Sequence, residues 1–303
     1  MHRTTILLGA LLIGTTSTTA SAGDVCIKSA KLQKKATAAE LKDDYNVTLA
    51  LCANLDDSDA ADECLADAKD EYKEGRELAK EQYQARLELC SKLGGGSYDP
   101  VIDPADFTSE IDNPYFPLPV GANWIYELDG VEGLEVVDVE VLDETREILG
   151  VECRAVRDTV TLDGEFVEDT IDWYAQDADG NVWYFGEISF GYEDGFVSSI
   201  EGSWLAGVDG AKPGIVMFAA PSVGTTYRQE WLPGDAEDAA TVLATDASIT
   251  IGAGTYTDCV LTEDFTPVEP EALENKYYAA GIGFVAEIST EGELLELVSA
   301  TGL

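Results

Sequence analysis

The chain has 303 residues, of which 59 are acidic and only 18 are basic, giving a formal net charge of −41 at pH 7. A surface with this much negative charge repels nucleic acids and anionic lipids. We therefore expect no nucleic-acid partner and no insertion into a membrane. The single histidine, His2, lies at the extreme N-terminus. Its position excludes Ser-His-Asp or Cys-His catalysis and histidine-ligated metals from the rest of the chain, so we expect no metal and no cofactor.

Residues 1–22 are typical of a signal peptide. His2 and Arg3 precede the apolar run 6–13, and the small residues Ala20-Ser21-Ala22 suit signal peptidase. The run is shorter than the roughly 20 apolar residues that span a bilayer. We therefore expect cleavage after Ala22 and a secreted or periplasmic protein.

Residues 23–93 predict two long helices, because alanine, leucine, lysine and glutamate dominate and no proline occurs. An aspartate-rich break at residues 55–59 separates the two helices. In the second helix, apolar and small side chains recur at steps of three and four residues, which marks one helical face. They are Ala61, Leu65, Ala68, Tyr72, Gly75, Ala79, Tyr83, Leu87 and Cys90.

The cysteine spacing predicts how these helices pair. Cys26 and Cys52 are 26 positions apart, and so are Cys64 and Cys90. Folding the chain back at residue 58 places Cys26 against Cys90 and Cys52 against Cys64. Four cysteines allow three pairings, and this one alone suits two straight antiparallel helices.

The other two cysteines, Cys153 and Cys259, lie in β-prone runs. In an oxidising compartment we expect them to form a third disulfide that joins strands distant in sequence. The alternative is that they are two buried thiols that never meet.

The composition changes after residue 93. Gly94-Gly95-Gly96-Ser97 ends the second helix, and residues 94–119 are predicted to form an extended linker. Residues 120–303 contain short β-prone runs between turn signals, about ten residues apart. The sequence thus predicts an α+β protein whose C-terminal domain is an antiparallel β meander, as a barrel, a half-open barrel or a sandwich.

Two segments carry a resemblance. Tyr115-Phe116-Pro117-Leu118, followed by Gly121, Trp124 and Tyr126, resembles the opening of a widespread group of secreted bacterial β proteins. Residues 277–285, which read YYAAGIGFV, resemble the closing strand of that group. The group has no settled activity, so the resemblance implies export and a β fold and assigns no catalytic residue.

Residues 172–185 form the sharpest local feature. A tight turn centred on Ala178-Asp179 would place Trp173 and Tyr184 on a core face. The opposite face would then combine aromatic rings with amides and a carboxylate, which suits sugars or small amphiphiles. The candidate ligand-binding residues on that face are Asp172, Tyr174, Gln176, Asn181, Trp183 and Phe185.

These patterns favour a secreted or periplasmic module that binds a small amphiphilic or sugar-like ligand. The helical hairpin would serve as a stalk or a protein-contact arm. A structural envelope or extracellular matrix protein without a ligand is the first alternative. A glycoside hydrolase that works with two carboxyl groups is the second, because this chemistry needs no histidine, yet no catalytic pair stands out among 59 acidic residues.

Overall fold

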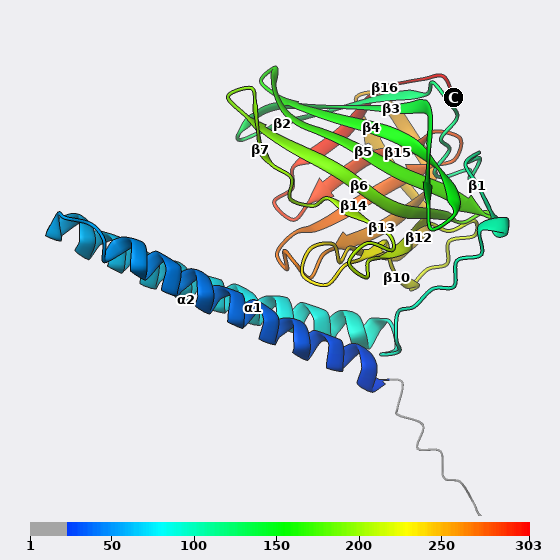
Figure 1. Ribbon diagram of the computed structural model, residues 1–303. Coiled ribbons are helices and arrows are strands. Elements are labelled where there is room, and N and C mark those ends of the chain that lie inside the picture. The colour runs from blue at the N-terminus through cyan, green and yellow to red at the C-terminus, as the bar shows by residue number, and fades with distance from the viewer. Residues whose placement is uncertain (1–22) are drawn as a thin grey trace, which may run out of the picture.

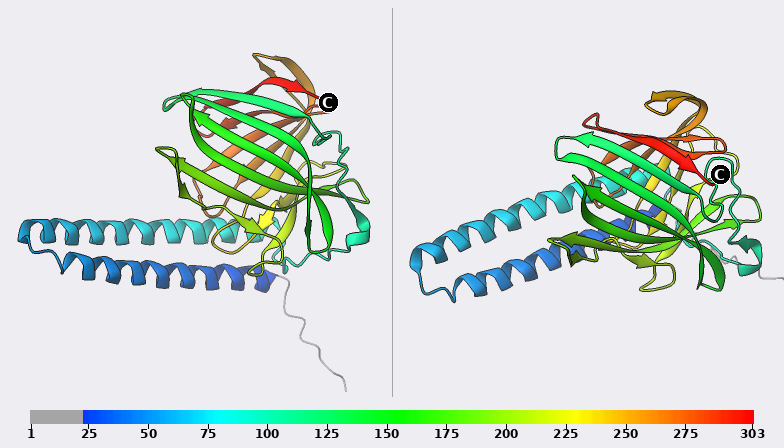
Figure 2. Two further views of the ribbon diagram at one scale, coloured as in Figure 1. Left: turned by 45° about the horizontal axis from the view of Figure 1, so that its top comes forward. Right: turned by 90° about the horizontal axis from the view of Figure 1, so that it is seen from above.

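The computed structural model describes residues 23–303, and the predicted signal peptide lies outside them. The chain forms a long helical hairpin beside a nearly closed antiparallel sheet (Figure 1). The helices are α1 (Gly23–Cys52) and α2 (Ser58–Lys92). Both views in Figure 2 show the far end of the hairpin projecting well beyond the sheet. In the part of the chain that the structure describes, no helix is long and apolar enough to cross a membrane.

Both predicted hairpin disulfides are confirmed. The Cα atoms of Cys26 and Cys90 lie 5.6 Å apart, and those of Cys52 and Cys64 lie 5.5 Å apart. Each bridge closes one end of the hairpin. Asp57 caps α2, since its carboxylate accepts hydrogen bonds from two backbone N–H groups at 2.9 Å.

Small and aromatic residues bring the two helices together. Tyr45 and Tyr72 stack with ring centroids 4.7 Å apart. At Gly75 a Cβ atom would lie only 2.6 Å from a methyl carbon of Leu41, so α1 packs directly on the glycine backbone. Tyr72 and Gly75 of the predicted helical face thus contact α1, whereas Leu65 of that face is exposed.

The base of the hairpin is anchored to the sheet by a buried ion pair. Arg86 on α2 donates from Nε and Nη2 to the carboxylate of Glu237, at 2.7–3.0 Å. Gln82 donates to the carbonyl of Val268 at 2.9 Å. These contacts fix the hairpin against the loops at one end of the sheet.

The sheet runs in the order β10-β12-β13-β14-β15-β16-β2-β3-β4-β5-β6-β9-β11, with β1 beside β5 and both β7 and β8 beside β6. Every pair of neighbouring strands within residues 23–303 is antiparallel, as the turn spacing predicts. The strands are β1 (Phe107–Thr108), β2 (Asn123–Gly130), β3 (Gly133–Ile148), β4 (Val151–Leu162), β5 (Glu165–Asp177), β6 (Val182–Glu193), β7 (Phe196–Ser199), β8 (Trp204–Leu205), β9 (Lys212–Met217), β10 (Thr226–Arg228), β11 (Glu230–Trp231), β12 (Ala239–Ile251), β13 (Gly254–Phe265), β14 (Leu273–Ala279), β15 (Gly283–Ser289) and β16 (Leu294–Thr301).

The sheet curls until its two ends meet. Tyr227 on β10 donates a hydrogen bond to the carbonyl of Val216 on β9, at 3.4 Å. Strands β2 and β16 pair in the middle of the order, so the first long strand and the last one lie side by side. The domain is therefore barrel-like, which agrees with one of the three predicted architectures.

Two apolar clusters cover opposite faces of this sheet. The inner cluster includes Trp124, Tyr126, Val156 and Tyr278. The outer cluster lies over β4–β6, and it includes the buried residues Cys153, Ala155, Trp173, Ala175 and Phe185. Alternation along β4 explains the division, because Ala155 and Val156 point to opposite faces.

The predicted linker, residues 94–119, is packed against the barrel. It contains a short 3-10 helix, η1 (Pro104–Asp106), and the strand β1. Ile111 and Leu118 are buried in the inner cluster. The backbone N–H groups of Asp112 and Asn113 donate to the amide oxygen of Gln176 at 3.0 and 2.9 Å. The segment is thus part of the β domain.

The predicted Cys153–Cys259 disulfide is wrong. Both cysteines are unpaired and buried. Cys153 is on β4 in the outer cluster, whereas Cys259 is on β13 in the inner cluster. Five strands separate β13 from β4 in the sheet. Each thiol fills its own apolar site, and burial raises the pKa of Cys153 to about 12.

Candidate ligand-binding site

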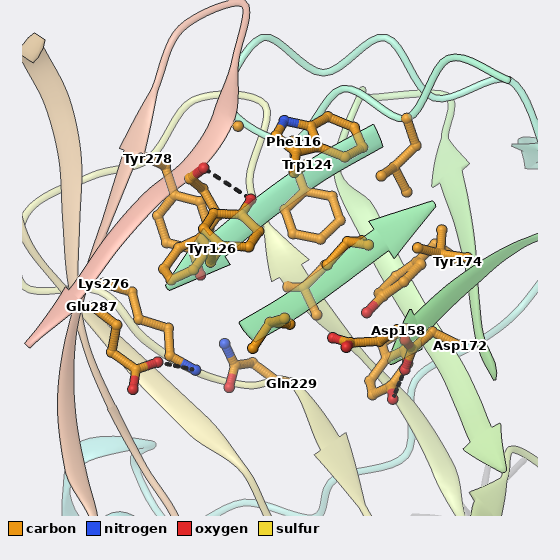
Figure 3. A pocket seen from close by; sticks show the side chains of 18 of the residues that line it. Phe116, Trp124, Tyr126, Asp158, Asp172, Tyr174, Gln229, Lys276, Tyr278 and Glu287 are labelled. Atoms are coloured by element: carbon orange, nitrogen blue, oxygen red, sulfur yellow. Dashed lines mark hydrogen bonds and ion pairs between the residues drawn. The ribbon is translucent and has the colours of Figure 1, made fainter. Parts of the chain in front are cut away.

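A cavity of about 400 Å³ lies inside the barrel. Figure 3 shows aromatic rings gathered at one end and charged or amide groups at the other. The aromatic and aliphatic lining consists of Phe116, Pro117, Leu118, Trp124, Tyr126, Val137, Val139, Val156, Val160, Tyr174, Tyr184, Val216, Tyr278, Phe284 and Leu295. The cavity is therefore amphipathic.

The aromatic end is built from segments far apart in the sequence. The ring of Phe116 lies 5.4 Å from that of Tyr174, and the ring of Tyr126 lies 5.0 Å from that of Phe284. Trp124 donates from Nε1 to the carbonyl of Ile282 at 2.8 Å. The phenol of Tyr126 donates to the carbonyl of Phe284 at 3.1 Å. Since these polar atoms are already bonded within the protein, the rings offer their carbon faces to the cavity.

The two segments that carry the sequence resemblance meet at this end. Phe116, Trp124 and Tyr126 come from the opening motif, and Tyr278 and Phe284 come from the closing one. The backbone N–H of residue 281 also donates to the carbonyl of residue 114, at 2.7 Å. Both motifs therefore line one end of the cavity. The relation to that group of secreted proteins stays a prediction.

The polar end contains six carboxyl groups and one amine. The carboxyl residues are Asp158, Asp172, Glu230, Asp238, Asp264 and Glu287. The amine is that of Lys276, whose Nζ lies 3.0 Å from the carboxylate of Glu274 and 3.4 Å from that of Glu287. Gln229 donates to Asp264 at 2.8 Å. Acidic groups thus greatly outnumber basic ones here.

Burial shifts the proton equilibria of this end. Desolvation raises the pKa of Asp158 to about 8, and the neighbouring charges of Asp172 and Glu168 act in the same direction. Desolvation also raises the pKa of Asp172 to about 8, with the charge of Glu187 adding to it. A hydrogen bond of 2.6 Å from the Tyr184 phenol opposes the shift at Asp172.

Burial and neighbouring charges also shift the pKa values of Glu230 and Lys276. Desolvation, reinforced by the charge of Asp238, raises the pKa of Glu230 well above its usual range. Burial alone would lower the pKa of Lys276, but the surrounding carboxylates of Asp264, Glu287 and Glu274 hold it well above its usual range. Lys276 is therefore a cation at neutral pH, whereas Asp158 and Asp172, with pKa values of about 8, are mainly protonated.

A second cavity of about 310 Å³ adjoins the polar end. The two cavities share Gln229, Glu230, Asp238, Asp264 and Lys276 in their linings. The second one adds the acidic residues Glu187, Asp235, Glu269 and Glu274. Its wall also includes Val268, whose carbonyl accepts the hydrogen bond from Gln82 of α2. The hairpin base therefore lies beside an acidic space that leads toward the interior.

The structure divides the six predicted ligand-binding residues between the two faces of the sheet. Asp172 and Tyr174 line the cavity. Phe185 is fully buried in the outer cluster, where its ring lies 5.5 Å from that of Phe107. Trp183 contacts Phe107 as well, with ring centroids 6.0 Å apart. The prediction that Trp183 and Phe185 share a face with Tyr174 is therefore wrong.

The other two predicted residues stabilise the local structure. Gln176 ties residues 112–113 to β5, and its Nε2 also donates to the carboxylate of Asp112 at 2.7 Å. The side chain of Asn181 donates to Asp177 at 2.9 Å and accepts from the backbone of Ala219 at 3.0 Å. Neither residue lines the cavity.

A one-residue error in the turn caused the wrong assignment. The backbone N–H of Asp177 donates to the carbonyl of Asn181, so three residues form the loop between them instead of two. Gly180 has a φ of 88°, which is typical of such a loop. Tyr174 therefore lies opposite Tyr184, and a bulge follows at the next pair, Trp173 and Gly186. Tyr184, predicted as a core residue, stacks on Tyr174 at 4.8 Å and lines the cavity.

Apart from Asp172, sequence reasoning missed the carboxyl groups of the polar end, and it missed the lysine. Alternation along β4 would have placed Asp158 on the face of Val156 and Val160. Lys276 could also have been noticed, since only six basic residues occur between residues 94 and 303. No group of three or more His, Cys, Asp or Glu side chains within residues 23–303 is arranged to hold a metal ion.

The comparisons with known proteins give little information about this chain. No protein-family model matches it, and no curated protein matches it either. One solved structure, described as "a putative lipoprotein" from Parabacteroides distasonis ATCC 8503, is similar with a TM-score of 0.34 and 13% identity. The match covers 62% of this chain and 98% of that one.

Proposed function

We propose that this protein binds one small amphiphilic molecule inside its barrel, outside the cytoplasm. The observation that carries the proposal is the amphipathic cavity of about 400 Å³, with aromatic rings at one end and ionisable groups at the other. Its volume lies in the range of about 300–1,000 Å³ that is usual for ligand sites. The two disulfides fit an oxidising compartment.

The lining favours a ligand with an apolar body over a sugar. The rings of Trp124 and Tyr126 offer only carbon faces, because their polar atoms bond to backbone carbonyls. Four valines, at positions 137, 139, 156 and 160, add aliphatic surface between the rings. A sugar hydroxyl at this end would lose its hydrogen bonds to water without replacement, which costs free energy.

The polar end gives little support to a glycoside hydrolase. Such an enzyme needs one protonated carboxyl and one ionised carboxylate beside the scissile bond. The pKa values of Asp158 and Asp172 are both raised to about 8, so both groups are mainly protonated at neutral pH. The role of the hairpin as a stalk or a protein-contact arm stays a prediction.

The test is to replace a residue of β4 that lines the cavity by a larger one. Val160 lines the cavity on β4, and its neighbour Thr159 lies on the opposite face. A neutral fluorescent probe with an apolar ring system, such as N-phenyl-1-naphthylamine, should gain fluorescence with the wild type and with Thr159→Phe. Val160→Phe should abolish the gain, because the new ring occupies the cavity.

Thermal unfolding of both variants controls for misfolding, since overpacking costs roughly 1–3 kcal/mol where the cavity does not accept the ring. Equal probe binding by a folded Val160→Phe protein would contradict the proposal. So would the absence of probe binding by the wild type.

A further inference from the structure

The charges that line the polar end do not balance. Six carboxyl groups line it, against the single amine of Lys276. That amine is already occupied by Glu274 and Glu287. Asp264 is also satisfied, because it accepts hydrogen bonds from Gln229 and from the hydroxyl of Thr262. Among the described residues, the other carboxyl groups of the lining, those of Asp158, Asp172, Glu230 and Asp238, form no ion pair.

Glu230 is the clearest of these groups. Its side chain is only 6% exposed, and it lines both the interior cavity and the adjoining acidic one. Within residues 23–303 no basic side chain pairs with it. Hydrogen bonds from the indole of Trp204 and the backbone of Asp238 favour its ionised form, but desolvation outweighs them and raises its pKa well above its usual range. Glu230 is thus a buried acid that faces a cavity and has no counterion.

Asp158 and Asp172 repeat this arrangement on β4 and β5. One carboxylate oxygen of Asp158 is buried and has no hydrogen-bond partner among the described residues. Asp172 accepts a single hydrogen bond, from Tyr184. Neither residue forms an ion pair within residues 23–303. The carboxyl groups of Asp158 on β4, Asp172 on β5 and Glu230 on β11 therefore line one cavity without ion-pair partners among the described residues.

Burying an acid without a partner is costly, and two events relieve the cost. The group either takes up a proton or meets a positive charge. The raised pKa values of Asp158 and Asp172 correspond to the first event. A ligand that carries a protonated amine would supply the second, and the amine N–H groups would donate hydrogen bonds to the carboxylates.

We propose that the ligand is a cationic amphiphile, whose apolar body packs on Trp124 and Tyr126 and whose protonated amine lies among Asp158, Asp172 and Glu230. This inference rests on the proposed function and adds the chemical class of the ligand. The acidic residues of the adjoining cavity extend the negative field toward solvent, which raises the local concentration of cations and repels anionic competitors.

The experiment compares three molecules with one hydrocarbon tail: octylamine, 1-octanol and octanoate. Each is titrated against the protein with bound N-phenyl-1-naphthylamine at pH 7. We expect octylamine to displace the probe at a concentration at least about tenfold lower than 1-octanol, with octanoate the weakest, since one unscreened charge pair is worth that factor.

The matched variants are Glu230→Gln and, as control, the exposed Glu165→Gln on β5. Glu230→Gln keeps the shape of the side chain, so it should retain 1-octanol binding and lose most of the preference for octylamine. Glu165→Gln should behave as the wild type. Ionisation of the cavity acids on binding octylamine should also release protons, which calorimetry in two buffers of different ionisation enthalpy detects.

The outcomes separate the two proposals. If the probe binds but octylamine and 1-octanol displace it equally, the cationic class is wrong and amphiphile binding stands. If the probe never binds, the proposed function itself fails. If millimolar calcium displaces octylamine saturably at matched ionic strength, the acids form a metal site and the inference is overturned.

Discussion

Replacing Arg86 by methionine tests whether the hairpin and the barrel form one cooperative unit. Arg86 and Glu237 are 4% and 1% exposed, and the guanidinium makes three hydrogen bonds of 2.7–3.0 Å to the carboxylate. Arg86→Met leaves Glu237 buried with only the backbone N–H of Gly234 as a donor. Breaking a buried pair in this way costs about 3–5 kcal/mol.

The double variant Arg86→Met/Glu237→Met removes both charges, so its cost should be much smaller than the sum of the two single changes. Lys80→Met is the control, because its ion pair with Glu77 is exposed and is worth at most about 1 kcal/mol. Urea unfolding followed by tryptophan fluorescence measures these costs in the barrel, which contains all five tryptophans. A cost below about 1 kcal/mol for Arg86→Met, or additive costs in the double variant, would refute the reasoning.

Three further predictions follow from burial and charge. Asp158 and Asp172 have pKa values of about 8 in the folded state and ordinary pKa values in the unfolded state. The free energy of unfolding should therefore fall from pH 5 to pH 8, by up to about 1.4 kcal/mol per pH unit for each group. The double variant Asp158→Asn/Asp172→Asn should flatten this slope, which urea unfolding measures. Cys153 and Cys259 should react with iodoacetamide in non-reduced protein only after unfolding, and mass spectrometry that finds them joined would disprove the two free thiols. Sodium chloride at 1 M should raise the melting temperature by screening the net charge of −41, and no change would mean that the surface charges hardly repel one another.

The hairpin could be predicted from the sequence because its information is local. Helical periodicity and equal cysteine spacing both depend on residues within one pair of elements, and a rise of 1.5 Å per residue converts spacing directly into alignment. Cys26–Cys90 and Cys52–Cys64 followed from that geometry. The Cys153–Cys259 prediction had no such support, since it depended on strand order, which residues 94–303 do not reveal.

The site depended on two kinds of information that the sequence carries weakly. A loop of three residues instead of two before Asn181 moved Tyr184 to the face of Tyr174 and took Trp183 and Phe185 away from it. Asp172 was among the residues predicted from the sequence, but choosing Asp158 and Glu230 among 59 acidic residues needed the pairing of β2 with β16 and the closure of the sheet. The aromatic residues of the two motif segments were visible in the sequence, but their convergence on one cavity was not.

The position of the acids argues for binding over a purely structural role. A barrel interior that served stability alone would be filled by closely packed apolar side chains. This interior instead leaves a cavity that Trp124, Val156 and Glu230 all line, and within residues 23–303 Glu230 has no ion-pair partner. Each such group costs folding free energy, because it must bind a proton to remain buried. Local violations of packing and charge pairing of this kind concentrate where a protein binds its ligand, and here they face a cavity that also has an aromatic wall.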